Sequence, residues 1–260
     1  MPVALTIAGS DSGGGAGLQA DLKTFAALGV HGTSAITCLT AQNPKRVLGV
    51  EPVSPKMLRR QLAAIFEELP PMAAKTGMLF SAENVRIVAE FFRTLPGRRR
   101  IPLIVDPVLV STSGTRLLEP KGIKILKEKL LPLAALVTPN VSEAEVLSGQ
   151  KISTVEDMVA AAKKIHLESG CAVLIKGGHL KNSERGTDLF FDGKNRFILR
   201  GRIVKGIRTH GTGCVYSAAI CAALALGKDL PRSVRLGKKF VTHAIAGSYH
   251  VGRHWGMDLK

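Results

Sequence analysis

The sequence has few aromatic residues, few cysteines and no long apolar run, and each of these scarcities excludes a class of protein. Its longest apolar stretches, 130–137 and 218–226, are far shorter than the roughly 20 residues that a membrane-spanning helix needs. The chain runs directly into the apolar segment 3–8 without a basic leader, so we expect no signal peptide. These features predict a cytoplasmic protein without a membrane partner.

The cysteines stand singly, with no Cys-x-x-Cys pair, at Cys38, Cys171, Cys214 and Cys221. Three of them lie inside apolar runs, which is typical of small buried side chains. A disulfide framework is not expected in an intracellular chain of 260 residues, and the spacing gives no zinc-ligand pattern. Cys214 differs from the others because it follows a glycine-rich segment at the predicted start of a helix.

Acidic residues are also scarce, with 20 Asp and Glu against 36 Lys and Arg, for a net charge of +16. Basic clusters such as 98–100 and 238–239 could contact nucleic acid. Aromatic residues make up only 5% of the chain, however, and no helix-turn-helix, zinc-finger or RNA-recognition pattern is evident. A basic surface also attracts anionic small molecules over a distance. We therefore expect a small-molecule substrate, and a nucleic-acid-binding protein stays as the alternative from another class.

Short apolar runs alternate with longer amphipathic segments along the chain. The predicted strands are 3–8, 33–39, 72–75, 102–105, 135–137 and 172–175. The predicted helices are 18–28, 55–68, 82–95, 122–131, 142–147, 154–169, 213–226 and 233–250, and 188–199 is expected to form a hairpin around the turn 192–195. Repeated strand–helix units predict an α/β fold over residues 1–260, with a mostly parallel sheet covered by helices on both faces.

Polar residues follow three successive predicted strands, at Asp106, Asn140 and Lys176. In open α/β sheets, ligands bind beyond the carboxyl ends of the strands. We therefore expect these three side chains to lie at one ligand site. Lys176 could neutralise phosphate charge and Asp106 could orient a metal or a phosphate chain, although either could also be an ordinary loop residue.

The segment 209–214, Thr-His-Gly-Thr-Gly-Cys, precedes an apolar helical run. Glycines before a helix let several backbone N–H groups point at one spot, and the helix N-terminus adds partial positive charge there. This pattern favours a phosphate site, although a plain turn before a helix would look the same. In the first helical turn the thiol of Cys214 can become more acidic and could accept a proton from a substrate hydroxyl. Its alternative is a packed helix cysteine like Cys221.

Asn140 and Glu143 are spaced so that a strand end and the next helical turn could converge on hydrated magnesium. The alternative is helix capping by Asn140 or Ser142, with Glu143 favoured by the helix dipole. The glycine-rich segment 9–17 contains a partial dinucleotide fingerprint at 15–20, but no acidic residue closes a second strand where that fingerprint expects one. The segment is therefore a weak signal for nucleotide binding and could equally close over a small substrate.

Seven blocks in order resemble the hydroxymethylpyrimidine and phosphomethylpyrimidine kinase family of thiamine biosynthesis, a branch of the ribokinase-like superfamily. The blocks lie at 8–24, 40–43, 75–79, 105–108, 138–140, 176–179 and 210–214, so the resemblance covers nearly the whole chain. It implies a ribokinase-like three-layer sandwich and a homodimer. It also implies a kinase that uses ATP and Mg²⁺ to phosphorylate a hydroxymethylpyrimidine and then its monophosphate.

The resemblance also assigns roles to individual residues. The residues that would line the pyrimidine pocket are Gly9, Asp21, Gln42, Met78 and Val108, with Gln42 reading the amino and nitrogen edge of the ring. Those that would bind ATP are Asp106, Asn140, Glu143, Lys176, Thr209, Gly213 and Lys238, with Asp106 and Glu143 holding Mg²⁺ through water. Gly211, Thr212 and Gly213 would form the anion hole beside Lys176, and Cys214 would be the base.

Two alternatives within enzyme chemistry stay open. A pyridoxal or pyridoxine kinase on the same scaffold would also act on a ring that carries a hydroxymethyl group. A dinucleotide-dependent oxidoreductase would use the glycine-rich segment 9–17 to hold its cofactor.

Overall fold

A nine-stranded sheet forms the centre of the computed structural model, which describes residues 1–97, 100–110, 117–178, 186–201 and 210–260. The strand order is β3-β2-β1-β4-β5-β6-β7-β8-β9. Their bounds are β1 (Val3–Asp11), β2 (His31–Asn43), β3 (Arg46–Pro52), β4 (Ala73–Thr76), β5 (Leu103–Val105), β6 (Leu136–Val137), β7 (Ala172–Ile175), β8 (Thr187–Phe191) and β9 (Arg196–Arg200). The strands from β2 to β7 pair in parallel, whereas β3, β8 and β9 are antiparallel additions at the two edges. The predicted mostly parallel sheet is confirmed.

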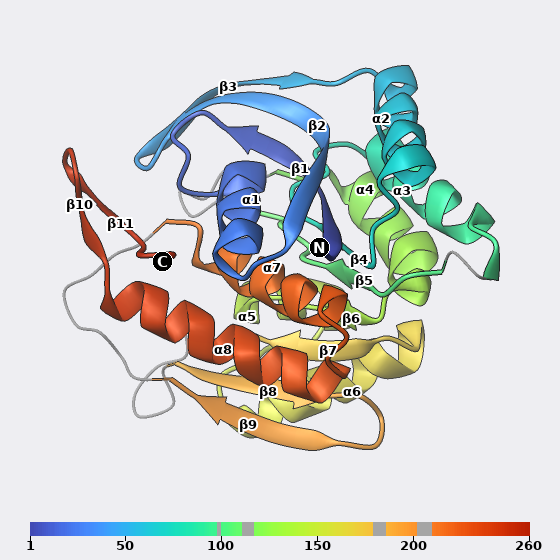
Figure 1. The fold of residues 1–260 in the computed structure, drawn as a ribbon. Helices are drawn as coiled ribbons and strands as arrows, with labels where there is room; N and C mark the ends of the chain where they lie inside the picture. The colour runs from blue at the N-terminus through green and yellow to red at the C-terminus, as the bar shows by residue number, and fades with distance from the viewer. Residues whose placement is uncertain (98–99, 111–116, 179–185, 202–209) are drawn as a thin grey trace.

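Helices cover both faces of this sheet (Figure 1). One face carries α1 (Gly17–Ala27), α7 (Thr212–Ala225) and α8 (Leu230–Ala246). The other carries α2 (Pro55–Glu68), α3 (Ala82–Thr94), α4 (Pro120–Ile125), α5 (Val141–Ser148) and α6 (Val155–Ser169). Successive residues of β1 join opposite cores, Ala4 on the α1–α7–α8 face and Leu5 on the other, because side chains alternate along a strand. The arrangement is the predicted three-layer sandwich.

The structure differs from the predicted elements in three places. Strand β3 was missed because all its residues are at least partly exposed and show no apolar alternation. The helix predicted over 122–131 changes after α4 into a π-helical turn (Leu126–Leu130) and a 3₁₀ turn (Leu131–Leu133), where Pro132 cannot continue an α-helix. The last helix ends at Ala246 rather than near 250, and the hairpin β10 (Tyr249–Val251) and β11 (His254–Gly256) follows.

The predicted hairpin near 188–199 is confirmed by the pairing of β8 with β9. Asp192 stabilises its turn, because one carboxylate oxygen accepts hydrogen bonds from the backbone N–H groups of Lys194 and Asn195. Within the described residues, no helix combines the length and the apolar character that crossing a membrane requires.

Candidate active site

A cavity of about 350 Å³ lies at the carboxyl ends of the parallel strands. It is lined by every predicted site residue that the structure describes, namely Gly9, Asp21, Gln42, Met78, Asp106, Val108, Asn140, Glu143, Lys176, Gly211, Thr212, Gly213, Cys214 and Lys238. Thr209 lies outside the described residues. A larger hollow of about 830 Å³ runs along α7 and α8, but of these residues it includes only Lys238. The chemistry therefore identifies the smaller cavity as the site.

The topology explains why residues so far apart in sequence meet. Asp106 follows β5 directly, Lys176 follows β7 directly, and Asn140 forms an isolated parallel bridge with Lys176 beyond the end of β6. Parallel strands end at the same edge of a sheet, so the polar residues that follow them lie side by side. The expected convergence of these three residues is what the structure shows.

Lys176 and Asp106 form an ion pair at the centre of this edge. The Lys176 Nζ atom lies 2.9 Å from Asp106 Oδ1, and the Ser217 hydroxyl donates to Asp106 Oδ2 at 3.1 Å. Burial alone would raise the pKa of Asp106, but the nearby ammonium groups of Lys176 and Lys75 lower it below its ordinary value. The carboxylate is therefore held in its charged form.

Glu143 is tied down by backbone groups rather than by a cation. The Asn140 side chain accepts from the Glu143 N–H at 2.9 Å and Glu143 Oε2 accepts from the Asn140 N–H at 2.9 Å, which is the capping-box arrangement. Glu143 Oε1 also accepts from the Leu109 N–H at 3.2 Å. Burial raises the pKa of Glu143, against the opposing effect of Lys176. The capping alternative is thus realised, and it fixes this carboxylate at the wall of the cavity.

Val108 has a backbone conformation that β-branched residues rarely adopt. Its φ is +46°, in the left-handed region, directly before the Leu109 N–H that reaches Glu143. Such strain persists only where surrounding contacts over-determine it, and it concentrates at functional sites. The strained turn therefore holds Val108 at the cavity wall.

The donors at this end suit a hydrated magnesium ion shared with phosphates. Asp106 and Glu143 supply carboxylate oxygens, the ligand type that Mg²⁺ prefers, and Mg²⁺ keeps several of its waters. Both Glu143 oxygens already accept backbone hydrogen bonds, which favours contact through water. Among the described residues no group of three or more His, Cys, Asp or Glu could hold a metal by itself. The site fits an ion that arrives with its phosphates.

The start of α7 forms the wall of the cavity beside Lys176 and Asp106. Gly211 has a φ of +82° and turns the chain into the helix, and no side chain of the described residues caps the helix start. A side chain at Gly213 would come within 3.1 Å of Lys176 Nζ. The uncapped backbone N–H groups of this turn and the Lys176 ammonium have the chemistry that suits an anion.

Cys214 lies in this first turn, but its acidity is opposite to our expectation. Burial raises the pKa of the Cys214 thiol to about 11, although the nearby Lys75 ammonium acts in the lowering direction. The prediction of a more acidic thiol from the helix terminus alone is therefore wrong. Burial has the larger effect.

Lys75 and Asp21 form the floor pair beneath the cavity. Lys75 Nζ lies 2.9 Å from Asp21 Oδ1, both side chains are 0% exposed, and the Thr6 hydroxyl donates to Asp21 Oδ2 at 2.6 Å. Burial lowers the pKa of Lys75, but Asp21 and the other nearby acidic groups, Asp106 among them, together raise it above its ordinary value, so the ammonium stays charged. Asp21 lines the cavity as expected, yet both its oxygens are already engaged. Lys75 was missed, although a lone lysine within a predicted buried strand was a usable signal.

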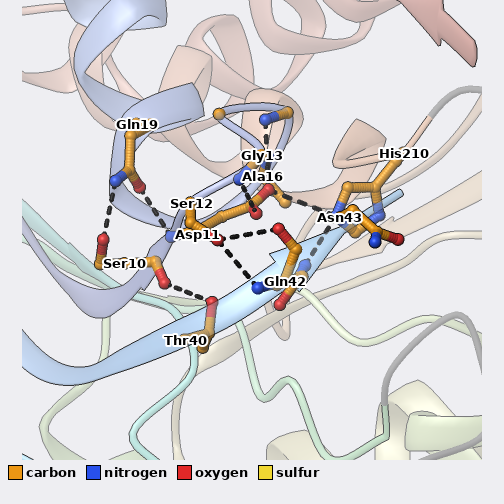
Figure 2. Close-up of polar contacts among 12 residues, drawn as sticks. Ser10, Asp11, Ser12, Gly13, Ala16, Gln19, Thr40, Gln42, Asn43 and His210 are labelled. Carbon is orange, nitrogen blue, oxygen red and sulfur yellow. Dashed lines mark hydrogen bonds and ion pairs between the residues drawn. The ribbon is translucent and has the colours of Figure 1, made fainter. Parts of the chain in front are cut away.

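The glycine-rich segment after β1 encloses the carboxylate of Asp11 (Figure 2). Asp11 accepts hydrogen bonds from the backbone N–H groups of Gly13 at 2.9 Å, Gly15 at 3.1 Å and Ala16 at 2.8 Å. Burial would raise the pKa of Asp11, but His210 and the backbone N–H groups of Gly13 and Ala16 lower it. A dinucleotide pyrophosphate would need the same N–H groups, so this geometry counts against the oxidoreductase alternative.

The side chains of Gln42 and His210 meet close to Asp11 (Figure 2). Gln42 Nε2 lies 3.0 Å from His210 Nε2. The Gln42 backbone is fixed by Ser12, whose hydroxyl donates to Gln42 O at 2.8 Å and accepts from Gln42 N at 2.8 Å. Sequence reasoning gave His210 no role, since only tertiary structure brings β2 and the segment before α7 together.

Lys238 joins α8 to the part of the cavity that holds Lys176. Its ammonium lies 2.7 Å from Asp188 Oδ2 and donates to the Gly186 carbonyl at 3.1 Å, while the Gly177 N–H donates to Asp188 Oδ1 at 3.0 Å. Asp188 therefore connects Lys238 to the loop that carries Lys176. Asp188 was missed because it reads as an ordinary hairpin residue.

Comparisons with known proteins identify the family of this chain. The family model described as phosphomethylpyrimidine kinase matches residues 11–257. A hydroxymethylpyrimidine/phosphomethylpyrimidine kinase of Synechococcus elongatus is 45% identical over 256 residues, which cover 98% of this chain and 96% of that protein.

Solved structures are similar over nearly the whole chain. A phosphomethylpyrimidine kinase of Clostridium difficile 630 has a TM-score of 0.82 at 40% identity, covering 94% of this chain and 100% of its own. A pyridoxal kinase of Bacillus subtilis, solved as an ADP complex, has a TM-score of 0.89 at 37% identity, covering 99% and 97%. The predicted ribokinase-like fold is confirmed, and the chain belongs to the phosphomethylpyrimidine kinase family.

Proposed function

We propose that this protein is a kinase that transfers the γ-phosphoryl group of ATP to the hydroxymethyl group of 4-amino-5-hydroxymethyl-2-methylpyrimidine. In a second turnover it phosphorylates the monophosphate to the diphosphate, for thiamine biosynthesis. The proposal includes a single kinase domain over residues 1–260, Mg²⁺ as cofactor, a cytoplasmic location and a homodimer.

The observation that carries the proposal is the division of one cavity into two chemically different parts. Gln42 and His210 lie together in one part of the lining, and Met78 lines the cavity beside Gly9, which suits a neutral heterocycle with polar edges. The other part, the phosphate end, holds Lys176 and the start of α7, which suit the charge of a nucleotide's terminal phosphates. An alcohol and a phosphate bound side by side in this cavity would be poised for phosphoryl transfer.

The residues of the phosphate end act by position and charge. Phosphoryl transfer passes through a loose transition state, so alignment and neutralisation of charge provide most of the catalysis. Lys176 and the backbone N–H groups at 212–214 are already held in place, and this preorganisation avoids a cost of reorganisation during the reaction. Mg²⁺ bound with ATP near Asp106 and Glu143 would neutralise further phosphate charge.

Cys214 is proposed as the general base: its thiolate form receives the hydroxyl proton and becomes the thiol, while the substrate oxygen bonds to the γ-phosphorus and ADP leaves with the oxygen that bridged the two. With a pKa of about 11, its thiol is mostly neutral before the reaction. We therefore expect a modest contribution, of about 10²-fold, at the low end of the range for general bases.

A direct assay tests the activity. Purified protein with ATP and Mg²⁺ is given the aminopyrimidine alcohol, its monophosphate or pyridoxal, and products are separated by chromatography. We expect the monophosphate and then the diphosphate of the pyrimidine. Absence of pyrimidine phosphates from the products would overturn the proposal.

The role of Cys214 is tested with a matched control in the same helix. Cys214→Ser should lower kcat about 10²-fold and leave the KM for ATP unchanged. Cys221→Ala, at a fully buried cysteine seven residues later, should keep normal kcat. An unaltered kcat in Cys214→Ser would remove the base assignment.

Pyridoxal is the second candidate substrate, because the pyridoxal kinase of Bacillus subtilis shares the fold so closely. The ratio of kcat/KM values for the two alcohols in the same assay decides between them. We expect the pyrimidine to be preferred, since Gln42 offers an amide to its amino edge.

A further inference from the structure

His210 holds a position that nothing in the phosphoryl-transfer chemistry explains. It directly precedes Gly211, at the start of the turn that leads into α7. Its ring points toward the part of the cavity where it meets Gln42 and Asp11 (Figure 2). Its side chain is only 21% exposed. Backbone packing keeps it there, because a side chain at Gly211 would collide with the Gly15 carbonyl.

The ring nitrogen Nε2 has two neighbours that require opposite hydrogen-bonding roles from it. The Gln42 amide nitrogen, 3.0 Å away, can only donate a hydrogen bond, and the Asp11 carboxylate oxygen Oδ2, 3.5 Å away, can only accept one. One nitrogen cannot accept from the first and donate to the second at the same time. The shorter distance is an ordinary hydrogen bond, whereas 3.5 Å is long for one.

Asp11 does not need a proton from the ring. Its two oxygens already accept three backbone N–H groups from the glycine-rich segment. The geometry therefore favours a His210 ring that carries its proton on Nδ1 and accepts from Gln42 at Nε2. In that state the amide nitrogen of Gln42 is engaged, and its oxygen Oε1 is left for the ligand.

The orientation of this amide decides what the cavity can recognise. The Gln42 backbone is fixed by Ser12, so the remaining freedom is which of the two amide atoms faces the ligand. An exposed oxygen accepts from an amino group on the substrate, whereas an exposed NH₂ would favour an acceptor there. A mismatched group leaves a hydrogen bond unmade and lowers affinity.

We propose that His210 is a positioning residue that fixes the amide orientation of Gln42 and so selects ring alcohols that carry an exocyclic amino group. The inference rests on the proposed function, because it concerns which alcohol the same cavity accepts. His210 acts through Gln42 and need not touch the substrate itself.

Two variants distinguish an effect on the orientation of the Gln42 amide from a general effect of His210 on the local structure. His210→Leu removes the acceptor and frees the amide to turn. His210→Gln keeps one, because its NH₂ can donate to Asp11 while its oxygen accepts from Gln42. Each is assayed with the aminopyrimidine alcohol, with pyridoxal and for the KM of ATP.

For His210→Leu we expect the KM for the aminopyrimidine to rise about tenfold, the upper range for one hydrogen bond, with kcat within about twofold of the parent. The KM for ATP and the kcat/KM for pyridoxal should stay unchanged. His210→Gln should restore the KM to within about threefold of the parent. Equal losses on both alcohols, a changed KM for ATP, or no change at all would overturn the inference.

A spectroscopic measurement tests the hydrogen bond without turnover. In protein labelled with ¹⁵N-histidine, the Nε2 resonance of His210 at neutral pH should have the shift of a nitrogen without a proton, and His210→Gln identifies the signal by its loss. A protonated Nε2 would refute the proposed arrangement. Failure of the parent protein to phosphorylate any pyrimidine would instead refute the proposed function and would leave the NMR result as a separate test.

Discussion

Three ion pairs in this protein have the same nitrogen–oxygen distance of 2.9 Å but very different surroundings. The floor pair, Lys75 and Asp21, is 0% exposed on both sides. In the pair at the sheet edge, Lys176 is 15% exposed and Asp106 3%. On the surface between α2 and α3, Arg59 is 49% exposed and Glu90 38%. The nitrogen–oxygen distance alone therefore does not tell how much each pair contributes to stability or activity.

The difference in exposure separates a structural role from a functional one. A buried charge left alone is costly, so the two residues of the floor pair depend on each other. Lys176 keeps some contact with solvent and could exchange part of its contact with Asp106 for a phosphate oxygen. The surface pair competes with water and salt, so its net contribution is small.

Removing one partner of the floor pair should have the largest effect on stability. Lys75→Met leaves the Asp21 carboxylate buried without its cation, and we expect the free energy of unfolding to fall by about 3–5 kcal/mol. Urea denaturation measures this loss. The double variant Lys75→Met/Asp21→Asn should recover part of this loss. A loss below about 1 kcal/mol in the single variant would contradict the claim that burial makes the two residues depend on each other.

Removing Lys176 should act mainly on catalysis. Lys176→Met takes a preorganised cation from the phosphate end, so we expect kcat to fall about 10²–10³-fold. The free energy of unfolding should fall by about 1–3 kcal/mol, since Asp106 keeps the Ser217 hydroxyl and the nearby charge of Lys75. Steady-state kinetics and urea denaturation of one preparation give both values. A stability loss as large as that of Lys75→Met would contradict the distinction.

The surface pair should matter least. Glu90→Gln removes one charge of a solvated pair, and we expect the free energy of unfolding to change by less than about 1 kcal/mol, with normal kcat. Thermal unfolding at low and high salt measures this change. A cost comparable to that of the floor pair would show that exposure does not rank these interactions.

Much of the fold was predictable because it follows local rules. The buried strands β5, β6 and β7 are short apolar runs, and the polar residues after them mark the edge where the cavity lies. Strand β3 was not predictable in this way, since its exposed side chains give no apolar pattern and only pairing with β2 makes it a strand.

The chemistry of the site was less predictable than its location. Whether Cys214 is more or less acidic depends on how far the folded chain removes its thiol from water, which no local pattern contains. Likewise Gln42 and His210 are 168 positions apart, and only the packed structure shows that they share a hydrogen bond.

The sealed position of Lys75 has a consequence for how the protein attracts its substrates. The net charge of +16 is felt by distant anions mainly through residues at the surface, where dissolved ions weaken the attraction beyond about 8–10 Å. Lys75 has a side chain that is 0% exposed, so no layer of bulk solvent separates its ammonium from the cavity that it lines. The approach of an anion should therefore depend on the ionic strength of the medium, whereas the field that the anion meets on arrival should hardly change.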